Sequence, residues 1–282
     1  MKNQNLDLMS TNELVDLFLN KELNSIRELK KQKNNIAKAI NLIKQQLQKE
    51  GRVFYIGSGT SGRLGILDAS ECKPTFSTNS FRGIIAGGKG AITQAKEGIE
   101  DNTKQAIKDL KKNKITKNDV MVGISASGET PYTLSAIKYA KKLIAKTISI
   151  TSNPKSTLSK ISHISISPEI KEEIISGSTR LSSGTIQKII LNMLSSISMI
   201  KTGKVYENLM IDVEPTNKKL IKRAIGIISS ICKVPLNKAK SLFLKSKKNT
   251  KAAIVMHYRG CDLEAAKKLL VKTNFDLRKI IH

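Results

Sequence analysis

The stretch RVFYIGSGTSGRLGILDASECK, residues 52–73, decides how the rest of this 282-residue chain is organised. Its pattern predicts a short apolar strand over residues 53–56, a loop of small residues over 57–62, and a helix that carries Glu71 near its end. Glycines let the backbone turn sharply, and the hydroxyls of Ser58, Thr60 and Ser61 would lie beside the free amides of a helix N-terminus. This combination predicts an anion-binding loop.

The same letters, Gly57-x-Gly59-x-x-Gly62, also match the dinucleotide-binding fingerprint. A nicotinamide site of that kind requires an acidic residue about 20 residues further on, where it binds a ribose hydroxyl. The corresponding segment, FRGIIAGG at 81–88, contains none. A phosphate monoester is therefore favoured over a dinucleotide as the ligand.

A second loop of the same chemistry follows the apolar run 120–124. It carries Ser125, Ser127 and Thr130, and Pro131 stands where a helix would begin. In a parallel sheet both loops emerge at the carboxyl edge of the strands, so they could bind one phosphate together. Each loop taken alone could also be an ordinary turn, because Ser, Gly and Thr are common turn residues.

Strand-like runs at 53–56, 83–86, 120–124, 147–150 and 163–166 alternate with helical stretches. This alternation predicts an α/β fold with a parallel sheet that is covered on both faces. Before it, a capping box at Ser10–Glu13 opens an amphipathic helix, and a second helix with apolar residues from Ile26 to Leu47 on one stripe ends at Gly51. We expect three parts: a helical arm at 1–49, the α/β domain at 50–212, and a small domain of Lys-rich helices at 213–282.

The formal charge is +26 and the isoelectric point is about 10, which raises the question of a nucleic-acid partner. Lysine is spread over the whole chain, however, and aromatic residues make up only 4% of it, so a base-stacking surface is not expected. Three cysteines and three histidines, His282 among them, form no metal-ligand spacing. The most apolar run, 189–200, is too short to span a membrane, and residues 1–10 lack the apolar core of a signal peptide. We therefore expect a cytoplasmic protein without a structural metal.

Seven motifs resemble, in order along the chain, those of the N-acetylmuramic acid 6-phosphate etherases of the sugar isomerase (SIS) superfamily. They are Gly57-Ser-Gly-Thr-Ser-Gly-Arg63, Leu67-Asp-Ala-Ser-Glu-Cys72, Glu97-Gly-Ile-Glu-Asp101, Ser127-Gly-Glu-Thr-Pro-Tyr132, Gly177-Ser-Thr-Arg180 with Gly184-Thr-Ile-Gln-Lys188, Asn192-Met-Leu-Ser195 and Gly203-Lys-Val-Tyr-Glu-Asn-Leu-Met210. The resemblance runs from about Ser10 to the C-terminus. It implies a three-layer SIS domain, a small helical tail similar to a ubiquitin-associated domain, and a homodimer.

The resemblance also implies a reaction, the removal of D-lactate from carbon 3 of a sugar phosphate. With the ring open, the aldehyde acidifies the proton on carbon 2, so a base can take it and the enolate can expel lactate before water adds to the double bond. This chemistry needs a general acid and a general base rather than a metal or a redox cofactor. By resemblance Glu71 is the acid and Glu100 is the base. From the residues alone either would be an ordinary surface Glu, and Glu97 would share a helical face with Glu100.

For the phosphate, the SIS pattern points to hydroxyls in both loops, and a third segment is implied near the sugar. The predicted binding residues are Ser58, Thr60, Ser61, Ser125, Ser127, Thr130, Glu173, Thr179 and Arg180. Arg180 could equally form a salt bridge at the start of a helix. The chain departs from the family at Lys89, where Glu is common, at Glu129 (Arg), at Ser182 (Lys) and at Lys73 (Pro).

Three other functions remain open. The chain could be a non-catalytic sugar-phosphate regulator, like the related glucokinase regulatory proteins, although Glu71 and Glu100 argue against it. It could be an SIS transcription regulator, although no helix-turn-helix is evident in the arm. An aldose–ketose isomerase of the same fold is the nearest enzymatic alternative.

Overall fold

The computed structural model describes residues 5–281 of the chain. It contains two compact units. Of the described residues, 5–70 and 80–195 form the first unit, and 71–79 and 196–281 form the second. The three-part division at 49/50 and 212/213 stays a prediction, because compactness alone does not define where one domain ends.

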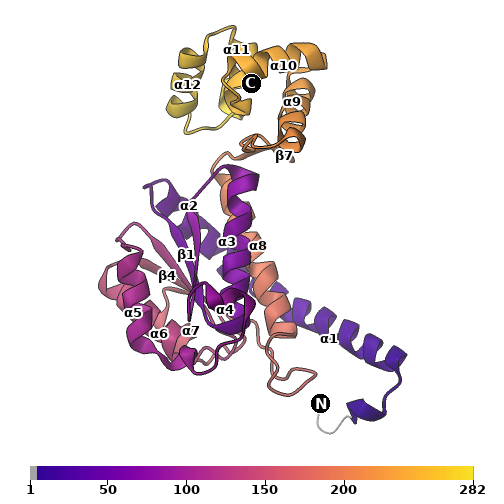
Figure 1. Ribbon diagram of the computed structural model, residues 1–282, viewed down its shortest axis with the longest axis vertical. Coiled ribbons are helices and arrows are strands. Elements are labelled where there is room, and N and C mark those ends of the chain that lie inside the picture. Colours follow the sequence, from indigo (N-terminus) through magenta and orange to yellow (C-terminus); the bar gives the residue numbers. More distant parts are fainter. Residues whose placement is uncertain (1–4, 282) are drawn as a thin grey trace. The chain divides into compact units, whose positions relative to one another are not determined.

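Within the described residues, the first unit is built on five parallel strands in the order β2-β1-β3-β4-β5 (Figure 1). The strands are β1 (Val53–Gly57), β2 (Phe81–Ile85), β3 (Val120–Ile124), β4 (Lys146–Ile150) and β5 (Ile164–Ile166). The runs predicted as strands are confirmed, with ends that differ by up to two residues. Strands β1 and β3 are buried throughout, as expected where helices cover both faces of a sheet.

Helices lie on both faces of this sheet. They are α2 (Lys33–Leu47), α3 (Gly59–Phe76), α4 (Gly90–Thr93), η2 (Ile99–Asp101), α5 (Thr103–Lys112), α6 (Pro131–Lys142), α7 (Thr157–Ile161) and α8 (Ser182–Lys201). Phe54, Ile56 and Met121 point to one face, where they pack with apolar side chains of α5, α6 and α7. Tyr55 points to the other face, where α3 packs closely on it at Gly65. This three-layer arrangement confirms the predicted α/β class.

The first glycine loop is shorter than predicted. Only Ser58 separates β1 from α3, because the helix already begins at Gly59 rather than after Gly62. Thr60 and Ser61 therefore lie in the first helical turn, a place where hydroxyl residues are well tolerated. The predicted helix start at Pro131 is confirmed in α6.

The N-terminal arm consists of η1 (Leu6–Leu8), α1 (Thr11–Lys31) and α2, and the predicted capping box between Ser10 and Glu13 is present. The prediction that Ile26 lies on the apolar stripe of the second helix is wrong, because Ile26 is 44% exposed. Ile26 belongs to α1, which ends at Gln32, whereas α2 is the helix that packs against β5. No helix within residues 5–281 combines the length and apolar character needed to cross a bilayer.

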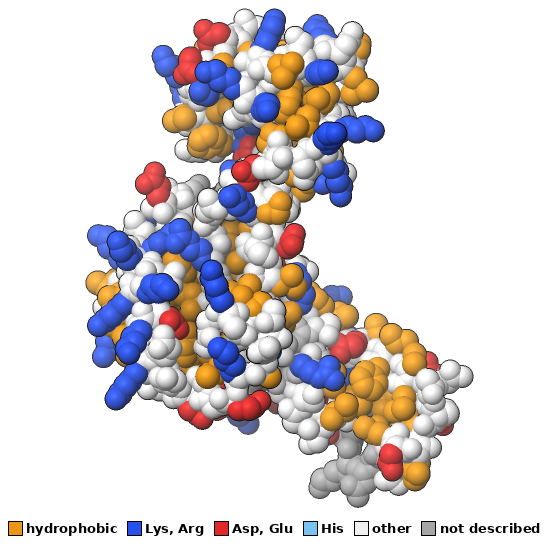
Figure 2. Space-filling model, in the orientation of Figure 1, with side chains coloured by type: hydrophobic (Ala, Val, Ile, Leu, Met, Phe, Trp, Pro, Cys, Tyr) orange, Lys and Arg blue, Asp and Glu red, His pale blue; other side chains and the backbone are white. Residues whose placement is uncertain are grey.

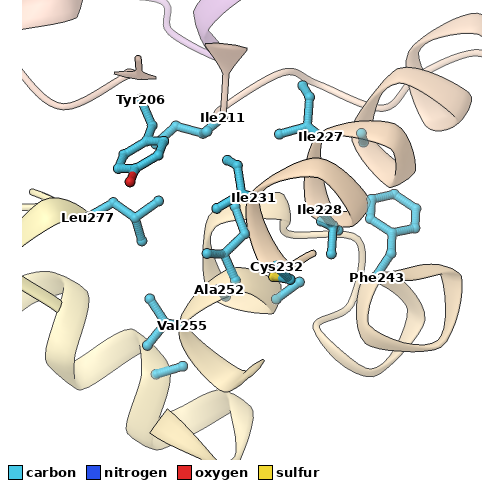
Figure 3. Close-up of a cluster of buried hydrophobic side chains, with 14 of the residues drawn as sticks. Tyr206, Ile211, Ile227, Ile228, Ile231, Cys232, Phe243, Ala252, Val255 and Leu277 are labelled. Atoms are coloured by element: carbon cyan, nitrogen blue, oxygen red, sulfur yellow. The ribbon is translucent and has the colours of Figure 1, made fainter. Parts of the chain in front are cut away.

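The second unit has its own apolar core (Figure 3). Its elements are the hairpin β6 (Val205–Tyr206) and β7 (Leu209–Met210), then α9 (Lys218–Cys232), α10 (Leu236–Lys245), α11 (Thr250–Arg259), α12 (Leu263–Lys272) and α13 (Arg278–Ile281). The predicted stop at Gly260 and start at Asp262 are confirmed. The hairpin was not predicted, because strands of two residues show no periodicity. A buried cation, Lys251, donates to the carbonyl of Gly203 at 2.8 Å and to Asp212 at 3.0 Å.

Lysine and arginine side chains are scattered over the visible surface of both units (Figure 2). Such scattering differs from the single basic face on which a nucleic acid would be bound. The expected absence of a nucleic-acid partner stays a prediction.

Candidate active site

The carboxyl ends of three neighbouring strands lie level with one another. The register pairs Gly57 with Ile124, and Ile124 with Ile150. The chain leaves β1 toward β2 on one side and leaves β3 toward β4 on the other, so β1 and β3 flank the topological switch point. Ligands of open α/β sheets bind in the crevice at such a point. The two predicted phosphate loops follow β1 and β3 directly.

The second loop brings its three predicted hydroxyls together. The Oγ of buried Ser125 lies 2.8 Å from Oγ1 of Thr130 and 3.3 Å from Oγ of Ser127. The backbone amide of Gly128 donates to Ser125 Oγ at 3.0 Å. The loop is therefore held by its own hydrogen bonds, while the exposed side chain of Ser127 can reach a ligand.

The first loop contains a hydroxyl group that makes no hydrogen bond within the described residues. Ser58 Oγ is buried and has no hydrogen-bond partner within the described residues, so it does not cap α3. Ser61 is buried in the first turn of that helix. The side chain of Thr60 lies near Gly184 of α8, since a Cβ placed on Gly184 would be 3.6 Å from Thr60 Cγ2 and 3.8 Å from the carbonyl oxygen of Thr179. Thr60 and Thr179 thus both lie close to the first turn of α8.

A hollow of about 700 Å³ extends from the second loop along the segment before α8. It is lined by Leu6, Ala126, Ser127, Ser152, Asn153, Ile170, Lys171, Glu172, Glu173, Ile174, Ile175, Ser176, Gly177, Thr179 and Ser183. Ser152 and Asn153 follow β4 and were not predicted as site residues. The polar run Thr-Ser-Asn at 151–153, directly after a strand, was the signal that could have identified them.

The helices that begin at this edge of the sheet differ in whether a carboxylate accepts hydrogen bonds from their N-terminal amides. Both carboxylate oxygens of Glu173 accept backbone amides at the start of α8, from Ser182 and Ser183, each at 2.9 Å. Glu129 accepts the amide of Thr157 at the start of α7 at 2.7 Å, and this hydrogen bond lowers the pKa of Glu129. Among the described residues, the side chains of Ser58 and Thr130 do not cap the helices that follow them, α3 and α6. Because free amides and the helix dipole favour an anion, the starts of α3 and α6 are both candidate anion sites.

Glu71 lies on α3, and Glu100 lies on the single turn η2. Both side chains are exposed to solvent. The expectation that Glu97 shares a helical face with Glu100 is wrong, because Glu97 and Gly98 form a turn and Gly98 has a positive φ of 71°. Arg180 is exposed in the turn before α8 and makes no ion pair within residues 5–281, which disfavours the salt-bridge alternative.

Asp68, one turn before Glu71 on α3, is a buried carboxyl that was not assigned a role from the sequence. It accepts a hydrogen bond from Ser195 Oγ at 3.3 Å, and Lys188 Nζ lies 3.8 Å away. Burial raises the pKa of Asp68, although Ser195 and Lys188 oppose the rise. Since Lys188 and Ser195 belong to α8, Asp68 fixes α3 against α8; the two helices run side by side in Figure 1.

No group of three His, Cys, Asp or Glu side chains gathers into a possible metal site in the part of the chain that the structure describes. His282 lies outside those residues.

Curated relatives resemble the chain over almost its whole length. It is 47% identical to the N-acetylmuramic acid 6-phosphate etherase of Francisella philomiragia, over 96% of this chain and 92% of that protein. It is 43% identical to the etherase of Clostridium beijerinckii, over 98% of this chain and 92% of that protein.

The chain belongs to the N-acetylmuramic acid 6-phosphate etherase family.

Family models match the chain in three places. Residues 35–141 match the glucokinase regulatory protein N-terminal SIS domain, residues 102–197 match the SIS domain, and residues 207–253 match the C-terminal lid domain of glucokinase regulatory protein. The predicted SIS domain and the helical domain that follows it are therefore confirmed.

Solved structures agree on the fold. A Bacteroides fragilis protein, described as a phosphosugar isomerase involved in capsule formation, has a TM-score of 0.54 at 23% identity, covering 71% of this chain and 95% of that one. The Vibrio vulnificus NanR protein, complexed with ManNAc-6P, has a TM-score of 0.50 at 16% identity, covering 70% of this chain and 66% of that one.

The structure shows what surrounds each of the four positions at which the chain departs from the etherase family pattern. Ser182 Oγ donates to Glu22 Oε1 on α1 at 2.9 Å, so this position joins the arm to α8. Glu129 is engaged at α7, as described above. Lys89 is exposed directly before the short helix α4, and Lys73 is exposed on α3. Their effect on substrate preference stays a prediction.

We expect Gly128→Ala to weaken sugar-phosphate binding about tenfold and to cost about 1–3 kcal/mol of folding stability. Gly128 has a φ of +71°, and a Cβ there would collide with Ser156 and lie 2.8 Å from Thr151 Oγ1. The loop would have to move away from β4 and α7. Calorimetric titration with N-acetylglucosamine 6-phosphate measures the binding. Gly226→Ala is the matched control, because it lies in α9 with open space around the added methyl. Unchanged affinity in Gly128→Ala would contradict the prediction that this loop binds the phosphate.

Proposed function

We propose that this chain cleaves the D-lactyl ether of N-acetylmuramic acid 6-phosphate and releases N-acetylglucosamine 6-phosphate and D-lactate. The main support is its 47% identity, over 96% of its length, to a relative that bears the name of this activity. The enzyme would be a carbon–oxygen lyase that acts in the recycling of cell-wall amino sugars. The phosphosugar isomerase and the ManNAc-6P complex among its structural neighbours are consistent with a sugar-phosphate substrate.

In this proposal the phosphate binds at the N-terminus of α3, between the two hydroxyl loops. Ser58 and Ser61 donate from the first loop, and Ser127 and Thr130 donate from the second. Holding the dianion positions the carbons that react, which converts binding energy into orientation. Thr179, Arg180 and the segment around Glu173 contact the sugar.

The chemistry follows from the open-chain aldehyde. Glu100 takes the proton from carbon 2, and the electron pair passes into the enolate. The enolate re-forms the aldehyde as it breaks the bond between carbon 3 and the ether oxygen, and Glu71 gives its proton to that oxygen. Water then adds across the double bond, with hydroxide to carbon 3 and a proton to carbon 2. Two carboxyl groups can serve as acid and base when their surroundings set their pKa values apart.

Both carboxylates are exposed to solvent in the single chain, whereas proton transfer and elimination are favoured in a site from which water is excluded. We therefore propose that the active form is a homodimer. Helix α1 presents an apolar stripe for the partner: Val15, Leu19, Leu23 and Ile26 are 51%, 59%, 55% and 44% exposed. Figure 2 shows hydrophobic side chains gathered over this helix. Their spacing puts all four on one helical face.

We expect Leu19→Asp with Leu23→Asp to convert the dimer to a monomer and to lower activity at least about tenfold, because charges cannot be buried unpaired in an apolar interface. Light scattering after size-exclusion chromatography measures the mass. Asn20→Asp, at an exposed position on the same helix but off the stripe, adds a charge and should leave the dimer intact. A monomeric wild type would refute the proposed assembly.

The decisive assay is D-lactate release from N-acetylmuramic acid 6-phosphate by the purified protein, without added metal, with the sugar product identified by mass spectrometry. Release of both products supports the etherase. Binding of the sugar phosphate without lactate would instead support a regulator, the less supported alternative, which is considered because family models of glucokinase regulatory protein match the chain. Interconversion of an aldose and a ketose phosphate would support an isomerase.

The partner in this proposal is a small sugar phosphate rather than nucleic acid or a membrane. A band shift with DNA or RNA at physiological salt would contradict this part of the proposal. The cytoplasmic location stays a prediction.

A further inference from the structure

Helix α6 connects the second phosphate loop to the segment that carries Glu100. Its N-cap residue, Thr130, and its first residue, Pro131, end that loop. Two side chains from its first half then contact α5, which begins two residues after η2. The hydroxyl of Tyr132 donates to Asp109 Oδ2 at 2.6 Å, and Ser135 Oγ donates to the carbonyl oxygen of Thr103 at 3.0 Å.

The path continues from α5 to η2 through hydrogen bonds. Gln105 Nε2 donates to the other oxygen of Asp109 at 2.8 Å, and the backbone amide of Gln105 donates to Asn102 Oδ1 at 2.9 Å. Asn102 in turn follows η2 directly, and its amide donates to the carbonyl of Ile99 at 3.3 Å. A series of hydrogen bonds thus runs from Tyr132 to the turn on which Glu100 lies.

Packing reinforces this path. Helix η2 packs against α6, and Ile99 lies against the buried cluster that contains Tyr132 and Ala136. Tyr132 is completely buried. Burial, together with the hydrogen bond to Asp109, raises the pKa of Tyr132, so the phenol keeps its proton and remains a donor.

We propose that Tyr132 is a positioning residue that couples occupancy of the phosphate loop to the placement of Glu100. The proposal rests on the proposed function, in which Glu100 removes the proton from carbon 2. When the phosphate immobilises the second loop, α6 is fixed at its start, and Tyr132 and Ser135 fix α5 and η2. An error of about 1 Å in a reacting group can cost about 100-fold in rate, so such a link has a large effect on catalysis.

Tyr132→Phe is a suitable probe, because the ring keeps its place in the core and Asp109 keeps its hydrogen bond from Gln105. The first measurement is amide hydrogen exchange of a peptide covering residues 96–104, with and without saturating N-acetylglucosamine 6-phosphate. In the wild type we expect the ligand to slow this exchange about fivefold, and in Tyr132→Phe less than about twofold, at similar affinity for the ligand. This measurement does not require turnover.

The second measurement separates kcat from KM. We expect Tyr132→Phe to lower kcat about tenfold while KM changes less than about twofold, and the deuterium isotope effect from carbon 2 to rise, because proton removal becomes slower. Ser135→Ala should show a smaller effect of the same kind, and Ser135→Thr should restore the wild-type rate. Ser135 lines an open hollow of about 390 Å³, which leaves room for the added methyl.

A double-mutant cycle distinguishes positioning from a general structural role. In a Glu100→Gln background, Tyr132→Phe should change the residual rate less than about twofold, because the group that it positions is already absent. An equal loss in both backgrounds, or a wild type whose exchange at 96–104 does not respond to the sugar phosphate, would overturn the proposal. If the wild type releases no D-lactate but its exchange responds through Tyr132, the coupling stands and the proposed function fails.

Discussion

Glu100→Gln and Glu71→Gln should each lower the rate of D-lactate release at least about 100-fold, since each would remove one proton transfer from the proposed elimination. Glutamine keeps the size of the side chain, and both positions are exposed, so neither change should unfold the chain. The two variants should differ in which step they lose. Glu100→Gln should abolish exchange of the carbon 2 proton with D₂O. Glu71→Gln should retain that exchange while the departure of lactate fails.

Glu97→Gln is the matched control for this pair. It removes the same charge three residues from Glu100, from an exposed turn to which the proposed mechanism gives no role. We expect it to change the rate less than about threefold, as is usual for a surface substitution. Lactate release that depends as strongly on Glu97 as on Glu100 would show that the base has been assigned to the wrong carboxylate.

Asp119→Asn should destabilise the chain by about 3–5 kcal/mol, the usual cost of removing one partner from a buried ion pair. Asp119 accepts from Arg52 through the backbone amide at 2.8 Å, Nε at 3.1 Å and Nη2 at 2.8 Å, and from the amide of Thr116 at 2.8 Å. In the variant an amide nitrogen would face one of these donors. Because Arg52 precedes β1 and Asp119 precedes β3, this pair aligns the two strands whose other ends lead into the two loops proposed to bind phosphate.

The pH dependence of stability tests the same pair. Burial acts to raise the pKa of Asp119, but hydrogen bonds from Arg52 and Thr116 outweigh it and hold the pKa below its usual range. A carboxyl with a lowered folded-state pKa stabilises the fold above its unfolded pKa of about 3.9, and this contribution is lost as pH falls through the folded value. Urea unfolding at pH 7 and near pH 3 should therefore show a difference between wild type and variant that shrinks in acid. Asp16→Asn, on the exposed surface of α1, should show the same stability as the wild type at both pH values. A loss of stability in Asp119→Asn that is as large near pH 3 as at pH 7 would contradict the ion-pair account.

Elements with a strong local signal were predicted well. The run 120–124 is a strand in which four apolar side chains and Gly123 are buried, and Pro131 starts α6 because its missing donor suits a first turn. Prediction was poorer where local signals conflict with packing. Gly98, with its positive φ, separates Glu97 from the turn of Glu100, although the letters alone were compatible with one helical face. Both oxygens of Glu173 bond to the start of α8, at amides 9 and 10 residues further along the chain that no periodicity indicates, while its predicted place at the substrate stays a prediction.

The sequence by itself determined the fold class, the two hydroxyl loops after apolar strands, and, through ordered motifs, the family with its two candidate carboxylates. These are local or linear properties, because strand periodicity, turn chemistry and motif order can be read without knowing which residues meet in space. Only the tertiary structure showed that carboxylates occupy the starts of α7 and α8. It also showed that Ser152 and Asn153 line the hollow, that Asp68 is buried between α3 and α8, and that Tyr132 reaches Asp109. Each of these depends on contacts between segments far apart in the chain, and such contacts are set by how helices pack on the sheet rather than by the residues nearby in sequence.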